Sequence, residues 1–322
     1  MLELLQKADI FDSEQRIDAL VSKWEKVLRN RFVVMVSKIK SSQTLEELID
    51  LIVAGRVEEA IAVGESHLAA FANSVNQAVI DAGDDTARLL NSKNIIVNFD
   101  VSNSRAVQIF QSNKLELIRE LQEQQRLAIH QSISRSLQGS VNPREAARGF
   151  RDAIGLTAKQ EQAVVNYRTL LEERSSVALD RKLRDRRFDK TIKRSIKTGK
   201  PLTEKQVNRM VSRYRERSIK FRSETIARTE ALPSVHQGTD EMYNQAIESG
   251  ELNAEEMIQI WHAAKDARTR DPHRKMQSQT RRIGEPFRSG AGNLLKYPGD
   301  RNAPASETIR CRCRKSTRIR GE

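Results

Sequence analysis

The only two cysteines of this chain are separated by a single arginine. Cys311 and Cys313 belong to the run Arg310–Arg314, and His273 precedes them in the same carboxy-terminal region. Zinc binds imidazole nitrogen and thiolate sulfur, usually with four ligands in a tetrahedron. Arginines beside a cysteine stabilise its thiolate, which is the form that binds metal. If the fold brings these side chains together, we expect a metal site, with zinc as its ion.

Other interpretations of these residues stay open. A disulfide between Cys311 and Cys313 is disfavoured by the geometry that the bond requires, but both can be ordinary small residues of a strand. His273 can also be a general base that Glu230 or Asp266 positions. The sequence contains no glycine-rich phosphate loop and no nucleophile elbow. We therefore expect no enzymatic activity.

Positive charge is concentrated in the middle of the chain. The segment from Arg181 to Arg222 holds 17 Lys or Arg and four acidic residues, so it alone carries +13, the net charge of the whole chain. Such clusters attract polyanions by counterion release, and few aromatics are interleaved for stacking on single strands. The alternative is a solvated helix face. We predict contact with duplex phosphates or an acidic protein face through Arg184, Arg186, Arg187, Lys193, Arg194, Lys197, Arg213, Arg215 and Arg217.

Length and composition indicate several helical domains. The 322 residues exceed the roughly 100 to 200 that one hydrophobic core serves. Aromatic residues make up 5% and charged residues 31%, which favours solvated helices around modest aliphatic cores. We predict a mainly α protein with a long-helix amino-terminal and central region and a small α+β carboxy-terminal domain. The predicted division is a helical interaction domain (1–140), a basic helical connector (141–225) and the carboxy-terminal domain (226–322).

Periodicity and breaker residues place the elements. Apolar residues recur every three or four positions, which predicts helices over about 17–39, 44–55, 57–90 and 104–137. The β-branched segment Asn94–Val101 predicts a short strand or an extended linker. Pro233 is expected to end or kink its helix, and Met257–Trp261 to pair as a strand. Further helix starts are predicted from capping signals at Asn142-Pro143, Thr157 and Thr203.

A series of short motifs in fixed order covers about half of the chain, from about residue 155 to 314. They are Ile154–Thr157, Asn166–Arg168, Leu183–Asp189, Arg213–Arg217, Glu224–Glu230, Trp261 with Asp266, Arg268, Thr269 and His273, Gly284-x-Pro286-Phe287, and Arg310–Cys313. In this order they resemble the phage head morphogenesis proteins, or Mu F-like minor head proteins. The resemblance assigns structural roles to Arg228, Glu230, Trp261, Arg268 and Phe287, and we expect Trp261 and Phe287 in the core.

The resemblance also bears on the metal ligands. Some members of the family carry cysteines in the segment where this chain has Arg270 and His273. The fourth ligand beside His273, Cys311 and Cys313 therefore stays open, with His262, Asp266 and Asp271 as candidates. We also expect Glu230 to form an ion pair with Arg268 or Arg270.

The resemblance implies a low-copy component inside the capsid of a tailed phage, acting in head assembly or genome delivery. The implied partners are the portal protein, a major capsid or scaffold protein, packaged double-stranded DNA and further copies of the chain. A non-specific nucleic-acid-binding module and a toxin-like enzyme carried in the particle are the alternatives. No apolar run approaches the roughly 20 residues that span a bilayer, so no membrane partner is expected. The expected location is the host cytoplasm during assembly and then the capsid interior of the virion.

Overall fold

The structure is a computed structural model that describes residues 13–41, 45–54, 56, 58–59, 65–138, 148–149 and 151–319. Its contacts divide the chain into two compact units. Unit 1 comprises Met1–Arg31, Phe71–Glu116 and Glu224–Glu322, and unit 2 comprises Phe32–Ala70 and Leu117–Ser223. Each unit is therefore assembled from segments that lie far apart in the sequence. The predicted division at residues 140 and 225 follows the sequence order instead, and it stays a prediction.

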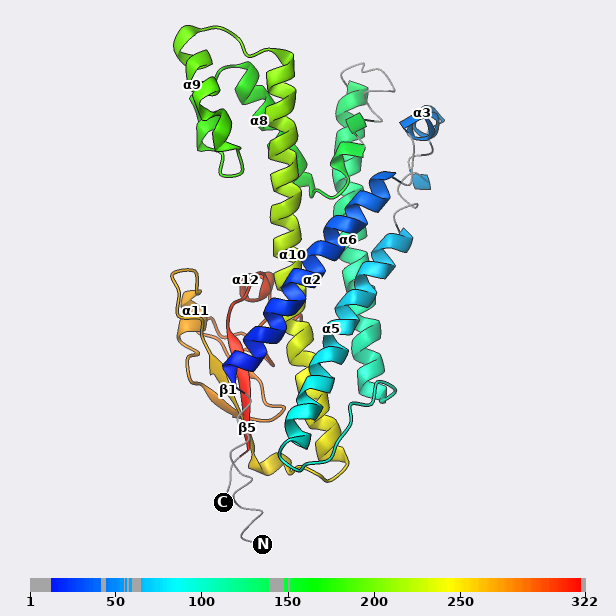
Figure 1. Cartoon of the computed structure of the whole chain (residues 1–322), viewed down its shortest axis with the longest axis vertical. Helices are drawn as coiled ribbons and strands as arrows, with labels where there is room; N and C mark the ends of the chain where they lie inside the picture. The colour runs from blue at the N-terminus through cyan, green and yellow to red at the C-terminus, as the bar shows by residue number, and fades with distance from the viewer. Residues whose placement is uncertain are drawn as a thin grey trace. The chain divides into compact units, whose positions relative to one another are not determined.

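Long helices dominate the described residues, and the strands are confined to the carboxy-terminal region, as the predicted fold class requires (Figure 1). The helices are α2 (Glu14–Ser41), α3 (Leu45–Val53), α5 (Glu65–Asn91), α6 (Ser104–Gln138), α8 (Ala158–Glu172), α9 (Asp189–Thr198), α10 (Glu204–Glu248), α11 (Asp271–Arg274) and α12 (Ala305–Thr308). Single 3₁₀ turns are η2 (Ser176–Asp180), η3 (Arg186–Phe188) and η4 (Ala254–Glu256). The strands are β1 (Met257–His262), β2 (Thr280–Arg282), β3 (Phe287–Arg288), β4 (Leu294–Leu295) and β5 (Arg314–Ile319).

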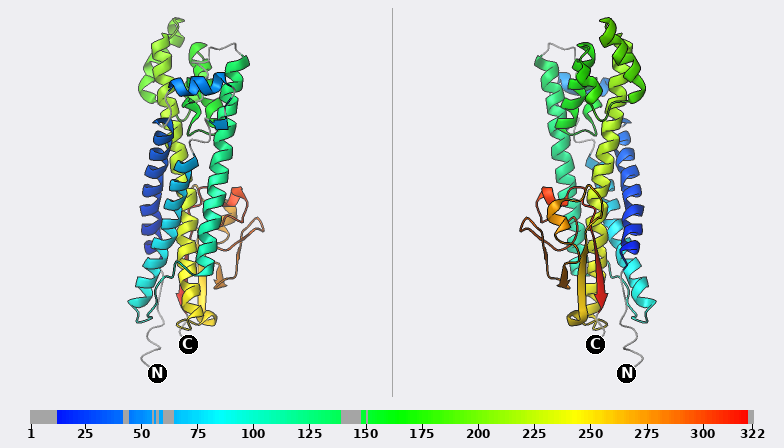
Figure 2. Two further views of the ribbon diagram at one scale, coloured as in Figure 1. Left: turned by 90° about the vertical axis from the view of Figure 1, so that its right-hand side faces the viewer. Right: turned by 90° about the vertical axis from the view of Figure 1, so that its left-hand side faces the viewer.

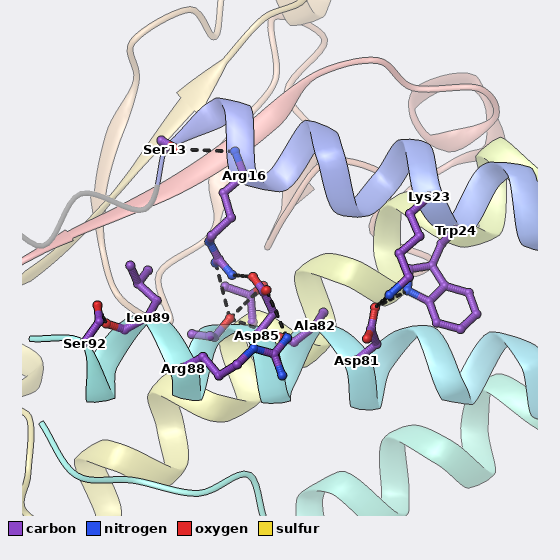
Figure 3. Close-up of polar contacts among 12 residues, drawn as sticks. Ser13, Arg16, Lys23, Trp24, Asp81, Ala82, Asp85, Arg88, Leu89 and Ser92 are labelled. Carbon is purple, nitrogen blue, oxygen red and sulfur yellow. Dashed lines mark hydrogen bonds and ion pairs between the residues drawn. The ribbon is translucent and has the colours of Figure 1, made fainter.

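In unit 1, the apolar stripe of α2 packs into the core, as its periodicity predicts. Ile17 and Leu28 have no exposed surface, and Val21 has 1%. Polar contacts fix the register of α2 against α5: the Trp24 indole N–H donates to Asp81 at 2.8 Å, and Arg16 pairs with Asp85 (Figure 3). The helical period and these cross-helix pairs together set which face of α2 is buried.

The second half of α10 lies against α5 at very short range. A Cβ atom added to Gly238 would come within 2.0 Å of the backbone oxygen of Val79. Glycine is therefore required there, because any side chain would separate the two helices. Thr86 and Thr239 meet beside this crossing, at 3.4 Å between their hydroxyl oxygens.

The sheet of unit 1 has the order β2-β1-β5, with both pairings antiparallel. The inward residues of β1 alternate, so Met257, Gln259 and Trp261 are buried while their neighbours are partly exposed. Met257 and Ile319 join a core cluster with Met242 and Tyr243 of α10. This packing places β1 and β5 beside α10, as both views in Figure 2 show. The hairpin β3-β4 forms a second small sheet.

Unit 2 has its own core. Tyr167 of α8 stacks on Tyr214 of α10, with ring centroids 4.5 Å apart, and Ile192 of α9 is buried in the same cluster. The capping box predicted at Thr157 is present, with Gln160 donating to and accepting from it as expected. Gly155, at φ +86°, lies where a Cβ would come within 2.7 Å of Val36.

Three local predictions have different outcomes. Asn94–Val101 is the extended linker and not the strand, and Asn91 holds it through both hydrogen-bonding groups of Val97. Pro233 does not end its helix, since α10 continues through it to Glu248. The ring is accommodated beside Gly299, where a Cβ would lie only 3.3 Å from the proline Cδ. The predicted helix starts at Thr44 and at Asn142-Pro143 lie outside the described residues.

Candidate metal centre and basic surfaces

A short helix positions His273. α11 begins with Asp271 and has a proline in its first turn, which suits a helix start because the ring fixes φ and needs no amide donor. The loop after β3 closes over it, where the Gly290 N–H donates to the Pro272 carbonyl at 3.0 Å. The His273 side chain is 1% exposed. The imidazole is therefore held inside the domain and does not reach solvent.

The cysteines lie in the short segment between α12 and β5. Arg310 precedes them with φ +55°, a left-handed conformation that costs a non-glycine residue about 1–2 kcal/mol. Two threonines of α10 hold it there: the Arg310 N–H donates to Thr229, and its guanidinium donates to Thr225. Both cysteines are buried, at 2% and 1% exposure. The reversal at Arg310 thus turns both thiols inward.

The three predicted ligands converge on one point. Nδ1 of His273 lies 3.6 Å from Sγ of Cys311 and 3.4 Å from Sγ of Cys313. All three donor atoms lie within 4.8 Å of one another, in the one such metal-competent group found in the described residues. The prediction that the fold brings His273 to the Cys-x-Cys pair is confirmed.

A carboxylate that the sequence did not reveal orients the histidine. Oε2 of Glu307 in α12 lies 2.7 Å from Nε2 of His273. The other oxygen of Glu307 accepts hydrogen bonds from Ser289 and from the Asn293 amide, each at 2.8 Å. With Nε2–H donating to this carboxylate, the unprotonated Nδ1 faces the two sulfurs. This is the arrangement in which metal-ligating histidines are usually held.

The titration of these groups follows from their mutual contacts. The pKa of Cys311 is lowered well below its usual value, first by the hydrogen bond from Cys313 and then by His273, against the opposing effect of burial. The pKa of Cys313 is raised, chiefly because Cys311 is its hydrogen-bond partner and because it is buried. Burial alone would lower the pKa of His273, but Cys311 and Glu307 outweigh it and raise the pKa. These shifts favour the thiolate of Cys311 and the neutral thiol of Cys313.

The predicted role of the neighbouring arginines is wrong. Their side chains turn away from the thiols: Arg310 binds Thr225, Arg312 binds Asp266 at 3.0 Å, and Arg314 binds Asp18 of α2. The stabilisation of the thiolate comes from the cysteine and histidine neighbours instead.

The candidates for a fourth ligand are not brought into the group. Asp266 accepts from the Thr269 hydroxyl and pairs with Arg312. His262 lies on β1, 2.7 Å from the Ser316 hydroxyl, and pairs with Glu14. Asp271 is 84% exposed and pairs with Arg274. Within the described residues, the fold therefore supplies three ligands.

The structural residues of the motifs form a core and a set of ion pairs. Trp261 and Phe287 have no exposed surface, which confirms them as core, and the Trp261 ring meets His273 edge-on with centroids 5.5 Å apart. Glu230 pairs with Arg301, so the pairing predicted with Arg268 or Arg270 is wrong.

The two motif arginines are paired with other acids. Arg228 makes a two-pronged pair with Glu25 of α2, at 2.8 and 2.7 Å. Arg268 faces Asp266 at 3.5 Å. Glu25 comes from a segment distant in sequence, so its pairing with Arg228 could not be derived from spacing, whereas Asp266 lies two residues from Arg268.

The predicted polyanion-binding residues of unit 2 fall into distinct groups. Arg184 and Arg215 are largely buried at 15% and 21% exposure, and they pair with Asp189 and Asp152. Arg187, Arg213 and Arg217 are more exposed but also pair with carboxylates. The remaining residues are exposed, and within the described part of the chain the structure records no carboxylate paired with them: Arg186, Lys193, Arg194 and Lys197.

Helix α9 gathers most of these exposed cations on one face. Its inward positions are Ile192 and Ser195, and the Ser195 hydroxyl donates to the Lys200 carbonyl in the turn that follows. Gly199 ends the helix with φ +68°. The basic face of α9 is defined here as Lys190, Lys193, Arg194 and Lys197, all exposed.

The sequence reasoning also missed a buried lysine. Lys315 on β5 is 1% exposed, and its ammonium nitrogen lies 2.5 and 2.6 Å from the two carboxylate oxygens of Asp240 on α10. Lys315, Ser316 and Thr317 are buried one after another on β5, so no alternation along the strand marked the lysine in the sequence.

Comparisons with known proteins agree with the motifs. None of the helices in the described ranges is long and apolar enough to cross a bilayer. Searches of curated proteins and of solved structures return no match. Residues 186–316 match the family model described as Phage Mu protein F like protein. Over residues 186–316 the chain is therefore similar to the Phage Mu protein F like family, which confirms the resemblance to phage head morphogenesis proteins.

Proposed function

We propose that this protein is a minor head protein of a tailed phage, carried in low copy inside the capsid and bound near the portal. The observation that carries the proposal is the family match over residues 186–316. That region contains the basic face of α9 and the group formed by His273, Cys311 and Cys313. It thus combines a surface suited to packaged DNA with a site suited to stabilising a small domain.

The chemistry of the buried group supports zinc. With Zn–S bonds of about 2.3 Å and Zn–N bonds of about 2.0–2.1 Å, a tetrahedral ion places nitrogen and sulfur roughly 3.6 Å apart. The observed separations are 3.6 and 3.4 Å. A single imidazole nitrogen accepts one hydrogen bond, so a metal explains two sulfurs at Nδ1 better than hydrogen bonding does. His273, Cys311 and Cys313 would hold the ion, and its role would be to order the loops of the domain.

The same burial argues against catalysis. The chain of contacts from cysteine to histidine to carboxylate resembles a nucleophile, a base and the group that orients the base. However, Cys311, His273 and Glu307 are all at most 3% exposed, so a substrate has no access to the thiolate. Reactive cysteines are partly exposed in general, whereas buried ones are inert or bind metal. We infer that the protein is not an enzyme, so the toxin-like alternative is not favoured.

The basic face of α9 supports contact with DNA. Four cations on a helix of ten residues present a dense positive surface to solvent. Contacts to phosphates made this way are independent of base sequence, as packaged DNA requires. A non-specific DNA-binding module without a virion role stays the second candidate, because this observation alone does not distinguish the two.

Copurification with the portal tests the main proposal. The full chain is co-expressed with portal and capsid proteins of its phage, and the isolated portal oligomer is analysed for bound chain and for zinc. We expect a substoichiometric portal complex with one zinc per chain. A chain that associates with DNA alone, and not with portal, capsid or scaffold protein, would leave only the second candidate.

Salt dependence tests the DNA contact. Each phosphate contact contributes about 0.9 to the slope of log affinity against log salt. Replacing Lys193, Arg194 and Lys197 by Gln should therefore lower the slope on a random duplex by up to about 2.7. The matched control removes three exposed arginines from unit 1 (Arg88, Arg274 and Arg282), and we expect it to leave the slope unchanged. Equal effects of the two triple variants would refute a role for α9.

Cobalt substitution tests the metal site independently of the virion. Cobalt bound by thiolates in a tetrahedron gives intense ligand-field and sulfur-to-metal absorption bands. We expect these bands in the wild-type chain and their loss in Cys311→Ser and Cys313→Ser. If correctly folded wild-type protein shows no such bands after cobalt is added, the three side chains form an ordinary hydrogen-bonded cluster.

A further inference from the structure

A second site lies on the outer side of the cysteine segment. Because the thiols turn inward, Arg310 and Arg312 point the other way, into a cavity of about 450 Å³. The cavity lies wholly within unit 1, where α2, α10 and the loop after β1 also line it. Six cationic side chains surround it: Lys26, Arg29, Arg228, Arg268, Arg310 and Arg312. We call this the arginine pocket.

The arginine pocket is not neutralised by its own acidic residues. Two carboxylates, Glu25 and Glu224, also line it, and Asp266 pairs with Arg312 from outside the lining. Six cations against three carboxylates leave a surplus of three positive charges at one cavity. Like charges gathered this way repel one another, so the arrangement is costly unless an anion occupies it.

The identity of the cations indicates what kind of anion fits. Arginine presents five donors in a planar fork that matches the oxygens of phosphate and carboxylate groups. The hydrogen bonds recorded for Arg228 engage two of its nitrogens, and the ion pair of Arg312 engages one. Donors thus remain on several guanidinium groups around the cavity.

Charge density distinguishes phosphate from carboxylate. Three surplus charges must be matched within a cavity of about 450 Å³, the size of a small-molecule site. An acidic peptide would need three side chains and the backbone that connects them. Linked phosphoryl groups carry the same charge in a smaller volume. The cavity therefore favours a phosphate chain over a peptide.

The backbone around the pocket is held in place before any ligand arrives. Arg310 has its left-handed conformation fixed by Thr225 and Thr229, and Arg228 is fixed by Glu25. A site whose donors are already positioned loses less entropy on binding. The pocket is thus built from four segments of unit 1 that the fold has already brought together.

We propose that the arginine pocket binds a phosphoryl oxyanion with linked phosphate groups, from either a free polyphosphate or a nucleic-acid backbone. The site is distinct from the basic face of α9, which lies in unit 2. It is also distinct from the metal group, whose ligands point to the opposite side of the same segment.

Calorimetry with tripolyphosphate at low salt tests the site. The variant Arg29→Gln with Arg268→Gln removes two pocket cations whose loss leaves the Arg228–Glu25 and Arg310–threonine contacts intact. We expect tripolyphosphate to bind the full-length wild type and the variant to bind at least about tenfold more weakly. The matched control, Arg88→Gln with Arg274→Gln, removes the same charge from exposed positions of unit 1 and should bind as the wild type does.

Competition then identifies the source of the phosphate. If a duplex oligonucleotide displaces tripolyphosphate and the pocket variant weakens both, the natural ligand is a nucleic-acid backbone. If the duplex still binds the variant normally, the ligand is a small polyphosphate. Absence of tripolyphosphate binding, equal weakening in the control, or tighter binding of a glutamate-rich peptide would each overturn the proposal. The triple variant of α9 keeps this result separate from the DNA contact proposed above.

Discussion

Replacing Asp240 by Asn tests how the sheet of unit 1 is anchored to α10. The substitution keeps the shape of the side chain and removes its charge, which leaves the Lys315 ammonium buried at 1% exposure without its counter-ion. Breaking a buried ion pair from one side costs about 3–5 kcal/mol. We expect about 3 kcal/mol here, the lower end, because Asp240 is 22% exposed and Asn retains one oxygen that can accept.

Intrinsic tryptophan fluorescence measures the effect. Its two tryptophans, Trp24 and Trp261, both lie in unit 1, so their fluorescence during urea unfolding reports on that unit alone. Adding Lys315→Met to Asp240→Asn removes the unpaired charge, and we expect the double variant to recover to within about 1 kcal/mol of wild type. Asp271→Asn is the control, since its pair with Arg274 is exposed and is expected to contribute under about 0.5 kcal/mol. A loss below about 1 kcal/mol in Asp240→Asn would refute the reasoning.

Three further predictions follow from other buried groups. Burial holds the pKa of His236 well below 6.5, so below pH 6.5 the unfolded chain protonates this imidazole and the folded chain does not. The free energy of unfolding should therefore fall by up to about 1.4 kcal/mol per pH unit as the pH decreases from 6.5. His236→Leu should remove this slope relative to wild type. Gly238→Ala should destabilise unit 1 by about 2–4 kcal/mol in the same tryptophan assay, because the new Cβ meets the Val79 carbonyl; a neutral result would mean that α5 and α10 are not in contact there. Glu307→Gln should weaken zinc binding about 10- to 100-fold in a chelator competition, and unchanged affinity would show that this carboxylate does not orient His273.

Local signals explain what the sequence could predict. The stripe on α2, the capping box at Thr157 and strand β1 depend on periods and spacings of a few residues, and the structure contains all three. The grouping of His273 with the cysteines was predicted because few other soft ligands exist in the chain. Residue type alone was enough to select these three side chains as candidate ligands.

Partners that are distant in sequence explain what it could not. Glu307 is one acid among 43 Asp and Glu residues, and nothing nearby marks it as the partner of His273. The arginines beside the cysteines were assigned to the thiols by adjacency, whereas their acceptors, Thr225, Asp266 and Asp18, come from three other segments. The neighbour of Pro233 in α10 is likewise distant in sequence, since Gly299 approaches the ring from the carboxy-terminal loops.

The segmented composition of unit 1 has a consequence for how the protein is made. The first turns of α2 are completed by β5 and by the neighbouring strand, through Arg314 with Asp18 and His262 with Glu14. During synthesis Asp18 therefore stays without its partner Arg314 until almost three hundred further residues have been translated. Such a nascent chain is exposed to premature association, and we expect its yield to depend on chaperones or on a co-translated binding partner that covers α2 in the interval.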